Sequence, residues 1–312
     1  MKKLLLILLC LPFIGFGQLT MIPDANFEQE LIDLGYDSGT PNGSVYTALI
    51  DTVTNLNVSY SNISNLTGIE DFASLAYLNC SGNQLSSLYL SNNTSLTDLR
   101  CSRNDLISLD LSTNTTLTYL ECKYNFTLTS LDVSGATALT TLLCHDNQIT
   151  NLDVSTNIAL TDLRCDSNQL TSLDVSNNTE LTRLFCFNNK IPSLDVSNNA
   201  ELTDLDCSTN LLTSLDVRNG NNINFAYFWV MNNSNLSCIN VDDFQYSLFN
   251  WTNIDPQHYF SNNCSRTAIQ EHTTNKKLLK VTDLLGRETK QTNQPLFYIY
   301  DDGTVEKRMV IE

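Results

Sequence analysis

Residues 160–180 read LTDLRCDSNQLTSLDVSNNTE, and residues 181–201 read LTRLFCFNNKIPSLDVSNNAE. Both stretches begin with the frame L-x-x-L-x-C-x-x-N-x-(L/I) and continue with S-L-D-V-S. The cysteine of this frame recurs at spacings of 21, 21, 22, 21, 21 and 21 residues. Its copies are Cys80, Cys101, Cys122, Cys144, Cys165, Cys186 and Cys207. A period this constant predicts a repeat protein whose coils stack on one another.

The tripeptide Leu-x-Cys is the strand-like part of each coil. Its leucine and cysteine lie on one face of a short strand, and the intervening residue lies on the other. A single coil cannot bury its apolar face, so we expect successive coils to stack as parallel strands around one core. An asparagine three residues after the cysteine marks a turn, where its amide can satisfy unpaired backbone groups. This asparagine occurs at Asn83, Asn104, Asn147, Asn168, Asn189 and Asn210.

The whole frame resembles the leucine-rich-repeat consensus, with cysteine in place of its third leucine. Valine takes that place in two outer copies, at Val58 and Val230. The resemblance spans residues 53–241 in about nine units, and an extra residue at Phe126–Thr127 accounts for the single spacing of 22. It implies a curved solenoid with a parallel sheet on its concave face, similar to bacterial extracellular, internalin-like leucine-rich-repeat proteins.

The second half of each coil, L-x-S-L-D-V-S, also alternates between apolar and polar residues. We therefore expect short extended or 3-10 segments on the convex side, since a 21-residue coil leaves little room for a long helix. The alternation points the aspartate of each S-L-D-V-S segment outward, so that these residues form a column. Neighbours in the column would be one strand spacing apart, about 4.8 Å. Calcium between the coils is one interpretation. The other is that each carboxylate accepts hydrogen bonds from nearby backbone N–H and hydroxyl groups. The column comprises Asp110, Asp132, Asp153, Asp174, Asp195 and Asp216.

The seven periodic cysteines raise the question of disulfides or a metal. Cβ atoms on neighbouring in-register strands are about 4.8 Å apart, whereas a disulfide needs about 3.8 Å. No C-x-x-C pair suggests zinc. We therefore expect buried free thiols that serve as small apolar side chains. Cys238 and Cys264 lie off the period, and we expect them to form a disulfide across an end cap.

A solenoid exposes its core at both ends unless caps cover it. For residues 18–52 we expect a cap built on one helix over residues 22–35, with Asp24 as its N-cap and Gly35 at its end. Phe27, Leu31 and Leu34 would share the buried face of this helix. Residues 242–264 would form the second cap, with Phe244, Leu248, Trp251 and Tyr259 turned inward.

The charge of the chain is unevenly distributed. Residues 18–264 carry 27 acidic and 7 basic side chains, a net charge of −20, whereas residues 265–312 carry 7 and 8, a net charge of +1. A body this acidic repels phosphate backbones and anionic membrane surfaces, which argues against nucleic-acid binding. It favours a neutral or cationic partner.

The first 17 residues, MKKLLLILLCLPFIGFG, have the layout of a secretory signal peptide: two lysines, an apolar stretch and small residues. We expect the mature chain to start near Gln18. A lipoprotein interpretation would make Cys10 the lipidated residue, but the bulky Leu9 precedes it. No later segment has the approximately 20 consecutive apolar residues of a transmembrane helix.

The C-terminal part begins with a polar linker over residues 265–277. The runs PLFYIY and TVEKRMVIE then flank Asp-Asp-Gly, which predicts a hairpin. LKVTDLLGRE followed by this hairpin resembles the C-terminal sorting domain of the type IX secretion system of Bacteroidetes. The resemblance covers roughly residues 268–312, with the sorting domain itself over residues 278–312. It implies a small β-sandwich-like domain, passage across the outer membrane, and release or attachment at the cell surface. The alternative is a β cap with no sorting role.

The sequence predicts a binding protein without enzymatic activity or a cofactor. Its three histidines, His145, His258 and His272, are scattered, and it contains no nucleophile elbow, zinc-protease motif, phosphate loop or dinucleotide motif. Its carboxylates recur at repeat positions, although a paired-carboxylate polysaccharide enzyme would be compatible with the composition. A passive spacer or coat protein is the other alternative.

The ligand site is predicted on the concave face, where the residues around each cysteine point outward. The early coils offer mixed polar side chains, such as Asp98 and Arg100. The later coils offer aromatic and arginine side chains, which often dominate binding energy. Two aromatic patches would be separated by carboxylates, an arrangement that suits a sugar or a basic protein segment. The alternative is that the C-terminal cap buries Tyr227 and Trp229. The predicted site comprises Arg183, Phe185, Phe187, Asp204, Asp206, Tyr227, Trp229 and Met231.

Overall fold

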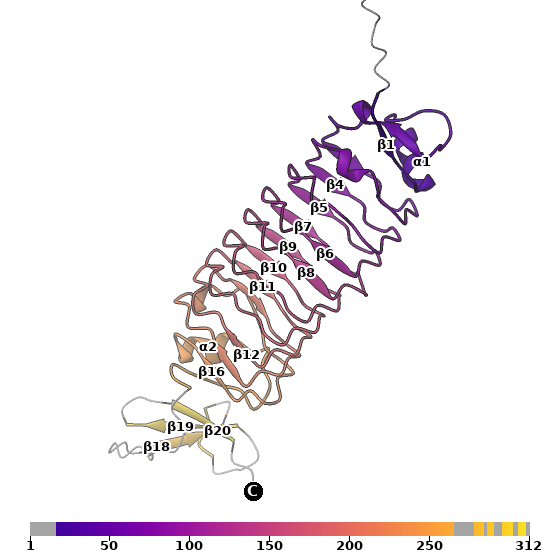
Figure 1. The fold of residues 1–312 in the computed structure, drawn as a ribbon. Helices are drawn as coiled ribbons and strands as arrows, with labels where there is room; N and C mark the ends of the chain where they lie inside the picture. Colours follow the sequence, from indigo (N-terminus) through magenta and orange to yellow (C-terminus); the bar gives the residue numbers. More distant parts are fainter. Residues whose placement is uncertain (1–16, 265–277, 284–285, 290–294, 302–304, 310–312) are drawn as a thin grey trace, which may run out of the picture.

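The computed structural model describes residues 17–264, 278–283, 286–289, 295–301 and 305–309. The predicted signal peptide, except Gly17, and the linker 265–277 lie outside the described residues. Residues 17–264 form an elongated solenoid of stacked coils, with strands running across its long axis (Figure 1).

One side of the solenoid is a parallel sheet of nine strands, as the Leu-x-Cys pattern predicts. Neighbouring strands pair in register, so that Leu163 lies beside Leu184 and Leu184 beside Leu205. We call the outward surface of this sheet the concave face. Its strands are β3 (Asn55–Asn57), β4 (Tyr77–Asn79), β5 (Asp98–Arg100), β7 (Tyr119–Glu121), β9 (Thr141–Leu143), β10 (Asp162–Arg164), β11 (Arg183–Phe185), β13 (Asp204–Asp206) and β15 (Tyr227–Trp229).

The opposite, convex side consists of short extended segments, which confirms that this leucine-rich-repeat solenoid is rich in β structure. A two-stranded sheet joins β6 (Ser108–Asp110) to β8 (Ser130–Asp132). A four-stranded sheet orders β12 (Ser193–Asp195), β14 (Ser214–Asp216), β16 (Cys238–Asn240) and β17 (Tyr259–Ser261). The 3-10 turns are η1 (Thr47–Leu49), η2 (Ile69–Asp71) and η3 (Asn222–Asn224).

The convex aspartates cap turns. In each coil the carboxylate of the column accepts a hydrogen bond from the backbone N–H two residues later, for example Asp110 from Ser112 at 2.9 Å and Asp174 from Ser176 at 2.9 Å. The hydrogen bonds to these serines lower the pKa of both carboxyls. The contacts support the hydrogen-bonding interpretation of the column. Among the described residues, no group of three or more His, Cys, Asp or Glu side chains is placed to hold a metal ion.

An asparagine ladder runs through the interior beside the cysteines. Asn168 Nδ2 donates to the carbonyl of Cys144 in the preceding coil at 2.9 Å and to that of Cys165 at 3.1 Å. Its Oδ1 accepts from the Ile149 N–H at 3.0 Å. The same contacts recur along the solenoid, so the predicted turn role of this asparagine is confirmed. Asn125, which follows Cys122, completes the column and sits next to the extra residue at Phe126–Thr127.

A second asparagine ladder, which we did not predict, lies at the other end of the convex segments. Asn178 Nδ2 donates to the carbonyls of Val154 and Asn157, and Asn199 repeats the pattern one coil later. Ala136 replaces this asparagine in one coil. There the chain approaches so closely that a Cβ on Gly135 would lie 1.9 Å from the Ser112 carbonyl oxygen, so only glycine fits.

The N-terminal cap contains the predicted helix, with two differences. Helix α1 spans Ala25–Asp33, shorter than expected, and begins after Asp24, whose Oδ1 accepts from the N–H groups of Asn26 and Phe27. Phe27 and Leu31 are buried, but Leu34 is 45% exposed because the helix has already ended. β1 (Leu19–Met21) pairs antiparallel with β2 (Ser44–Tyr46) beside it.

The C-terminal cap is closed by a disulfide between Cys238 and Cys264, as predicted. Helix α2 (Phe244–Asn250) begins after Asp243, and Trp251 is 4% exposed over the last coil. The prediction for Tyr259 is wrong: it is 43% exposed, and Phe260 points inward instead. Strand β17 pairs in register with β16, Phe260 beside Ile239, and this register fixes which of the two rings faces the core.

The described C-terminal part is a three-stranded antiparallel sheet ordered β18 (Leu278–Thr282), β19 (Pro295–Tyr300) and β20 (Val305–Met309). β19 and β20 form the predicted pair, while their connecting residues 302–304 lie outside the described residues. Arg287 donates through Nε to Asp283 at 2.7 Å and fixes the turn after β18.

The periodic thiols provide a test of the stacking. All seven are free and buried, and burial raises the pKa of Cys80 and Cys122 to about 12. We predict that an alkylating reagent labels none of them in the folded mature chain and all seven after denaturation without reductant. Peptide mapping by mass spectrometry measures this, with the Cys238–Cys264 peptide pair as internal control. Disulfide-linked peptides among the periodic cysteines would contradict the stacking.

Candidate functional site

The predicted site residues lie together on the concave face, on β11, β13 and β15 and the residues that follow them. Arg183, Phe185 and Tyr227 are half-buried, whereas Trp229 is 37% and Met231 is 39% exposed. The inward positions between them belong to Leu184, Cys186 and Phe228, so strand alternation keeps the outward side chains away from the core.

Two arginines meet on one carboxylate at the edge of this group. Arg164 contacts Asp162 in its own strand through Nε at 3.2 Å, and Arg183 Nη1 reaches across to Asp162 at 2.8 Å. The Arg164 guanidinium also lies 5.4 Å from the centre of the Phe185 ring, within the range of a cation–π contact. Arg183 is therefore drawn toward β10 and away from β13.

The aromatic side chains form one continuous cluster, which corrects the expectation of two patches separated by carboxylates. The Phe185 and Tyr227 ring centres are 5.6 Å apart although β13 lies between their strands. Tyr227 stacks on Trp229 at 5.1 Å with an angle of 8° between the planes. Aspartate is short, so the longer rings lean across β13 above it. Asp206 is 7% exposed and accepts from the Ser208 N–H at 3.0 Å and the Tyr227 hydroxyl at 3.4 Å.

The C-terminal cap covers the end of the core and leaves the outward rings accessible. Trp251 stacks on the inward Phe228 with ring centres 3.9 Å apart and also meets Phe225 and Phe260. Trp229 contacts the cap through a backbone bridge to Asn253 while its side chain stays exposed. The alternative was that the cap buries both Tyr227 and Trp229. Trp229 is 37% exposed, and Tyr227 is half-buried with its ring against Phe185 and Trp229.

One buried acid on this face was not predicted. Asp166 follows Cys165, is 6% exposed, and has no ion pair or hydrogen bond from another side chain in the described chain. Burial raises the pKa of Asp166 to about 7, and the charges of Asp146 and Asp206 add to this effect. Arg164 opposes it. The carboxyl therefore titrates near neutral pH.

Sequence reasoning also missed a second aromatic–arginine group in the early coils, where it predicted only mixed polar side chains. Arg100 lies 5.5 Å from the Tyr77 ring centre and 5.0 Å from that of Tyr119, and it pairs with Asp98 at 3.1 Å. The signal was present, because Tyr77, Arg100 and Tyr119 occupy outward positions on consecutive strands β4, β5 and β7.

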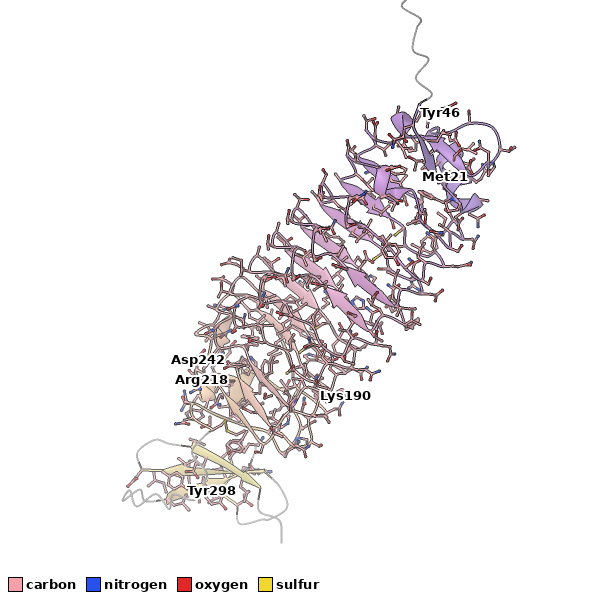
Figure 2. All side chains as sticks on the ribbon, viewed as in Figure 1. Met21, Tyr46, Lys190, Arg218, Asp242 and Tyr298 are labelled. Atoms are coloured by element: carbon pink, nitrogen blue, oxygen red, sulfur yellow. A yellow bond between two sulfur atoms is a disulfide. The ribbon has the colours of Figure 1, made fainter. Side chains whose placement is uncertain are left out.

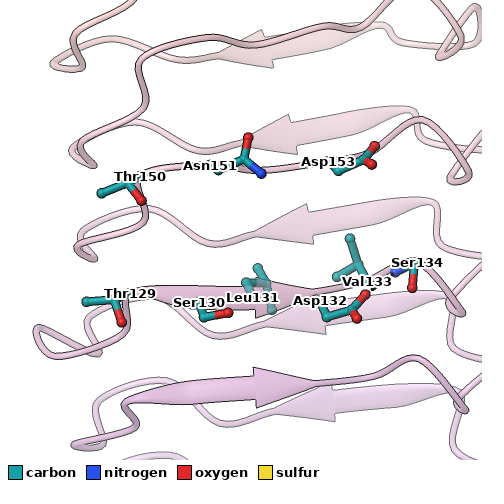
Figure 3. Close-up of a pocket in the computed structure, with 9 residues that line it drawn as sticks. All are labelled: Thr129, Ser130, Leu131, Asp132, Val133, Ser134, Thr150, Asn151 and Asp153. Atoms are coloured by element: carbon teal, nitrogen blue, oxygen red, sulfur yellow. Dashed lines mark hydrogen bonds between the residues drawn. The ribbon is translucent and has the colours of Figure 1, made fainter.

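A hollow of about 420 Å³ opens on the convex side (Figure 3). It lies beside β8, where the two-stranded convex sheet ends and before the four-stranded one begins at β12. Asp132 and Asp153 lie on neighbouring coils at its rim. Each carboxylate accepts the N–H of the serine two residues later, Ser134 and Ser155, at 2.9 Å. These carboxylates serve as turn caps on the convex side.

Comparisons with known proteins support the fold. Neither a protein-family model nor a curated protein matches the chain. Internalin C2 from Listeria monocytogenes has 22% identity over 77% of this chain and 94% of its own, with a TM-score of 0.50. The chain has a leucine-rich-repeat fold. The functional domain of InlJ from the same organism, described as including a cysteine ladder, has 27% identity over 78% of this chain and 70% of its own, with a TM-score of 0.36.

A further leucine-rich-repeat structure is the ectodomain of the plant receptor kinase GASSHO1/SCHENGEN3 from Arabidopsis thaliana, solved with Casparian strip integrity factor 2. It has 21% identity over 64% of this chain and 25% of its own, with a TM-score of 0.48. Within the described leucine-rich-repeat chain, no helix is long and apolar enough to span a membrane.

The raised pKa of Asp166 leads to a prediction for stability against pH. Because the folded-state pKa of about 7 exceeds the ordinary value of 3.8, the folded state holds this proton over a range in which the unfolded chain loses it. The stability associated with Asp166 is present at low pH and is lost as the pH rises toward 7. We predict that Asp166→Asn becomes progressively more stable than the unsubstituted chain over this range, by at least about 1 kcal/mol.

Urea denaturation at intervals between pH 4 and 8 measures the difference. His145 and His258, whose pKa values burial lowers, are present in both proteins and cancel in the comparison. Parallel stability curves for the two proteins would show that Asp166 does not titrate in this range.

Proposed function

We propose that this protein is an exported, surface-attached or released binding protein that recognises a protein or glycan ligand on its concave face. The observation that carries the proposal is the continuous, partly exposed ring cluster of Phe185, Tyr227 and Trp229, with arginines at its edge. Exposed apolar clusters usually mark interaction sites, and aromatic and arginine side chains supply most of the binding energy at such sites.

The alternatives have less support. A passive spacer needs only length, and it gives no reason to hold Trp229 and Met231 in solvent on one face. A polysaccharide-active enzyme needs an acid and a base across a cleft. Asp132 and Asp153, the acids at the convex hollow, are engaged as turn caps.

Removal of two rings tests the binding face. Phe185→Ala with Phe187→Ala should leave the melting temperature nearly unchanged, because both side chains are half-buried and point outward. We expect the free energy of unfolding to fall by only about 1 kcal/mol. Retention on a protein and glycan array, or adhesion to the partner surface, should fall strongly. The array and a thermal melt measure both quantities on the same preparations.

A matched control removes two rings elsewhere. Tyr89 and Phe126 are 78% and 67% exposed and lie off the concave strands, so Tyr89→Ala with Phe126→Ala should leave binding unchanged. A large loss of stability with intact binding in the Phe185/Phe187 variant would mean that these rings belong to the core, and it would refute the proposed face.

We further propose that the C-terminal sheet, β18 to β20, is a type IX sorting domain that directs the chain across the outer membrane by contact with the secretion machinery. The support is the sequence resemblance over residues 278–312 together with the antiparallel pairing of β19 and β20. The Cys238–Cys264 disulfide suits an oxidising, extracellular location.

Deletion of residues 266–312 tests the sorting role. The solenoid, with its disulfide at Cys264 retained, should still unfold cooperatively but should accumulate inside the outer membrane. Cell fractionation with immunoblotting measures its location, and the undeleted chain is the control. Unchanged delivery of the truncated chain to the surface or the medium would exclude a sorting role for this sheet.

A further inference from the structure

Two arginines on the concave face are each held by the same arrangement of a ring and a carboxylate. Arg100 lies over Tyr119 and pairs with Asp98. Arg164 lies over Phe185 and pairs with Asp162. The guanidinium is planar, so it can stack on a ring with its face and donate to a carboxylate along its edge.

The last concave coils repeat the rings and the carboxylates without an arginine. Asp204 accepts from the Thr203 hydroxyl at 2.7 Å, and Asp206 accepts only from the Ser208 N–H and the Tyr227 hydroxyl among the described residues. Neither carboxylate has an ion pair within residues 17–264. Tyr227 and Trp229 lie on the next strand, directly beside Asp204 and Asp206 in the register.

The basic residues nearest to Asp204 and Asp206 in the sequence already bind other partners. Arg183 is paired in register with Asp204, yet its Nη1 binds Asp162 on the other side. Lys190 Nζ donates to Gln169, and Arg218 pairs with Asp216 on the convex side. Figure 2 shows Lys190 and Arg218 at opposite margins of the solenoid. The rings and carboxylates of the last coils thus lack the cation that their counterparts hold.

We infer that Asp204, Asp206, Tyr227 and Trp229, together with Phe185, bind an arginine side chain of a partner polypeptide. We call these five residues the arginine site. The inference rests on the proposed concave-face function and names its ligand class.

Charge and ring geometry favour this ligand over a neutral sugar. Residues 18–264 carry a net charge of −20, which steers cationic segments toward the solenoid. The Tyr227 and Trp229 rings stack on each other with an angle of 8° between their planes, so each ring covers one face of the other. They therefore do not lie side by side as a flat two-ring platform for a sugar. An arginine needs one free ring face and a carboxylate edge, as Arg164 finds at Phe185 and Asp162.

The two tryptophans give the test an internal reference. Trp229 is 37% exposed at the arginine site, whereas Trp251 is 4% exposed in the cap core. Titration of the full mature chain with the capped peptide GSRGSRG, followed by the two indole N–H resonances in NMR, should shift the Trp229 signal saturably. The Trp251 signal should stay in place. The same peptide with citrulline for arginine keeps the shape and loses the charge, and it should bind at least about tenfold more weakly.

Charge-matched variants separate the site from the general acidity of the chain. Asp204→Asn with Asp206→Asn should weaken arginine-peptide binding at least about tenfold, and the amide oxygen of residue 206 can still accept the Ser208 N–H, which protects the fold. Asp132→Asn with Asp153→Asn removes the same charge from the convex side and should change the affinity less than about twofold. Circular dichroism and thermal melts verify that both variants are folded.

The outcomes distinguish this inference from the proposed function. Equal binding of the arginine and citrulline peptides, or equal losses in the two charge variants, would overturn the arginine site. A shift of Trp229 by a neutral oligosaccharide such as cellohexaose, unaffected by Asp204→Asn with Asp206→Asn, would also overturn it while leaving the concave-face function intact. If the Phe185/Phe187 variant retains all array binding, the proposed function itself fails.

Discussion

The solenoid depends on the in-register stacking of coils, and the buried asparagines make that stacking specific. Each coil must turn where its backbone groups have no partner in the strand ladder, and an unsatisfied buried carbonyl or N–H destabilises the fold by about 1–3 kcal/mol. Asn168 satisfies three such groups at once, in its own coil and in the coil before it. A slip of one coil by one residue would break the two contacts that cross between coils, with the Cys144 carbonyl and the Ile149 N–H. The ladder therefore fixes the register that also places every cysteine and leucine inward.

This register makes the concave face a regular grid of side chains. Outward residues on neighbouring strands lie directly beside one another, so a change at one position alters its neighbours in the adjoining coils. The register places Arg183 between Asp162 and Asp204. Arg183 pairs with Asp162, as Arg164 does, so both guanidinium groups lie at β10. Because Arg164 and Arg183 both pair with Asp162, neither neutralises Asp204 or Asp206, and the concave face of the last coils is therefore negatively charged.

The repeat and its strand pattern were predictable in detail because each coil reports the same physical requirement. The alternation of Leu and Cys, the turn asparagine and the capping aspartate recur so often that chance matches are excluded, and the structure contains all three. The caps were predicted less well. Leu34 and Tyr259 were assigned to the core by local apolar pattern, but helix α1 ends before Leu34 and the register of β17 turns Phe260 inward.

For the candidate site, the sequence placed Phe185, Tyr227 and Trp229 on one face but could not tell how far their side chains extend over β13. The second asparagine ladder and the buried Asp166 were also missed, because burial at those positions comes from neighbouring coils and not from the local pattern. The sequence by itself determined the coil, its period and which residues face outward, since these follow from the alternation of side chains along a strand. Only the tertiary structure decided which outward side chains meet, because contacts across coils depend on side-chain length, on the rotamer each arginine adopts, and on which of two carboxylates it pairs with.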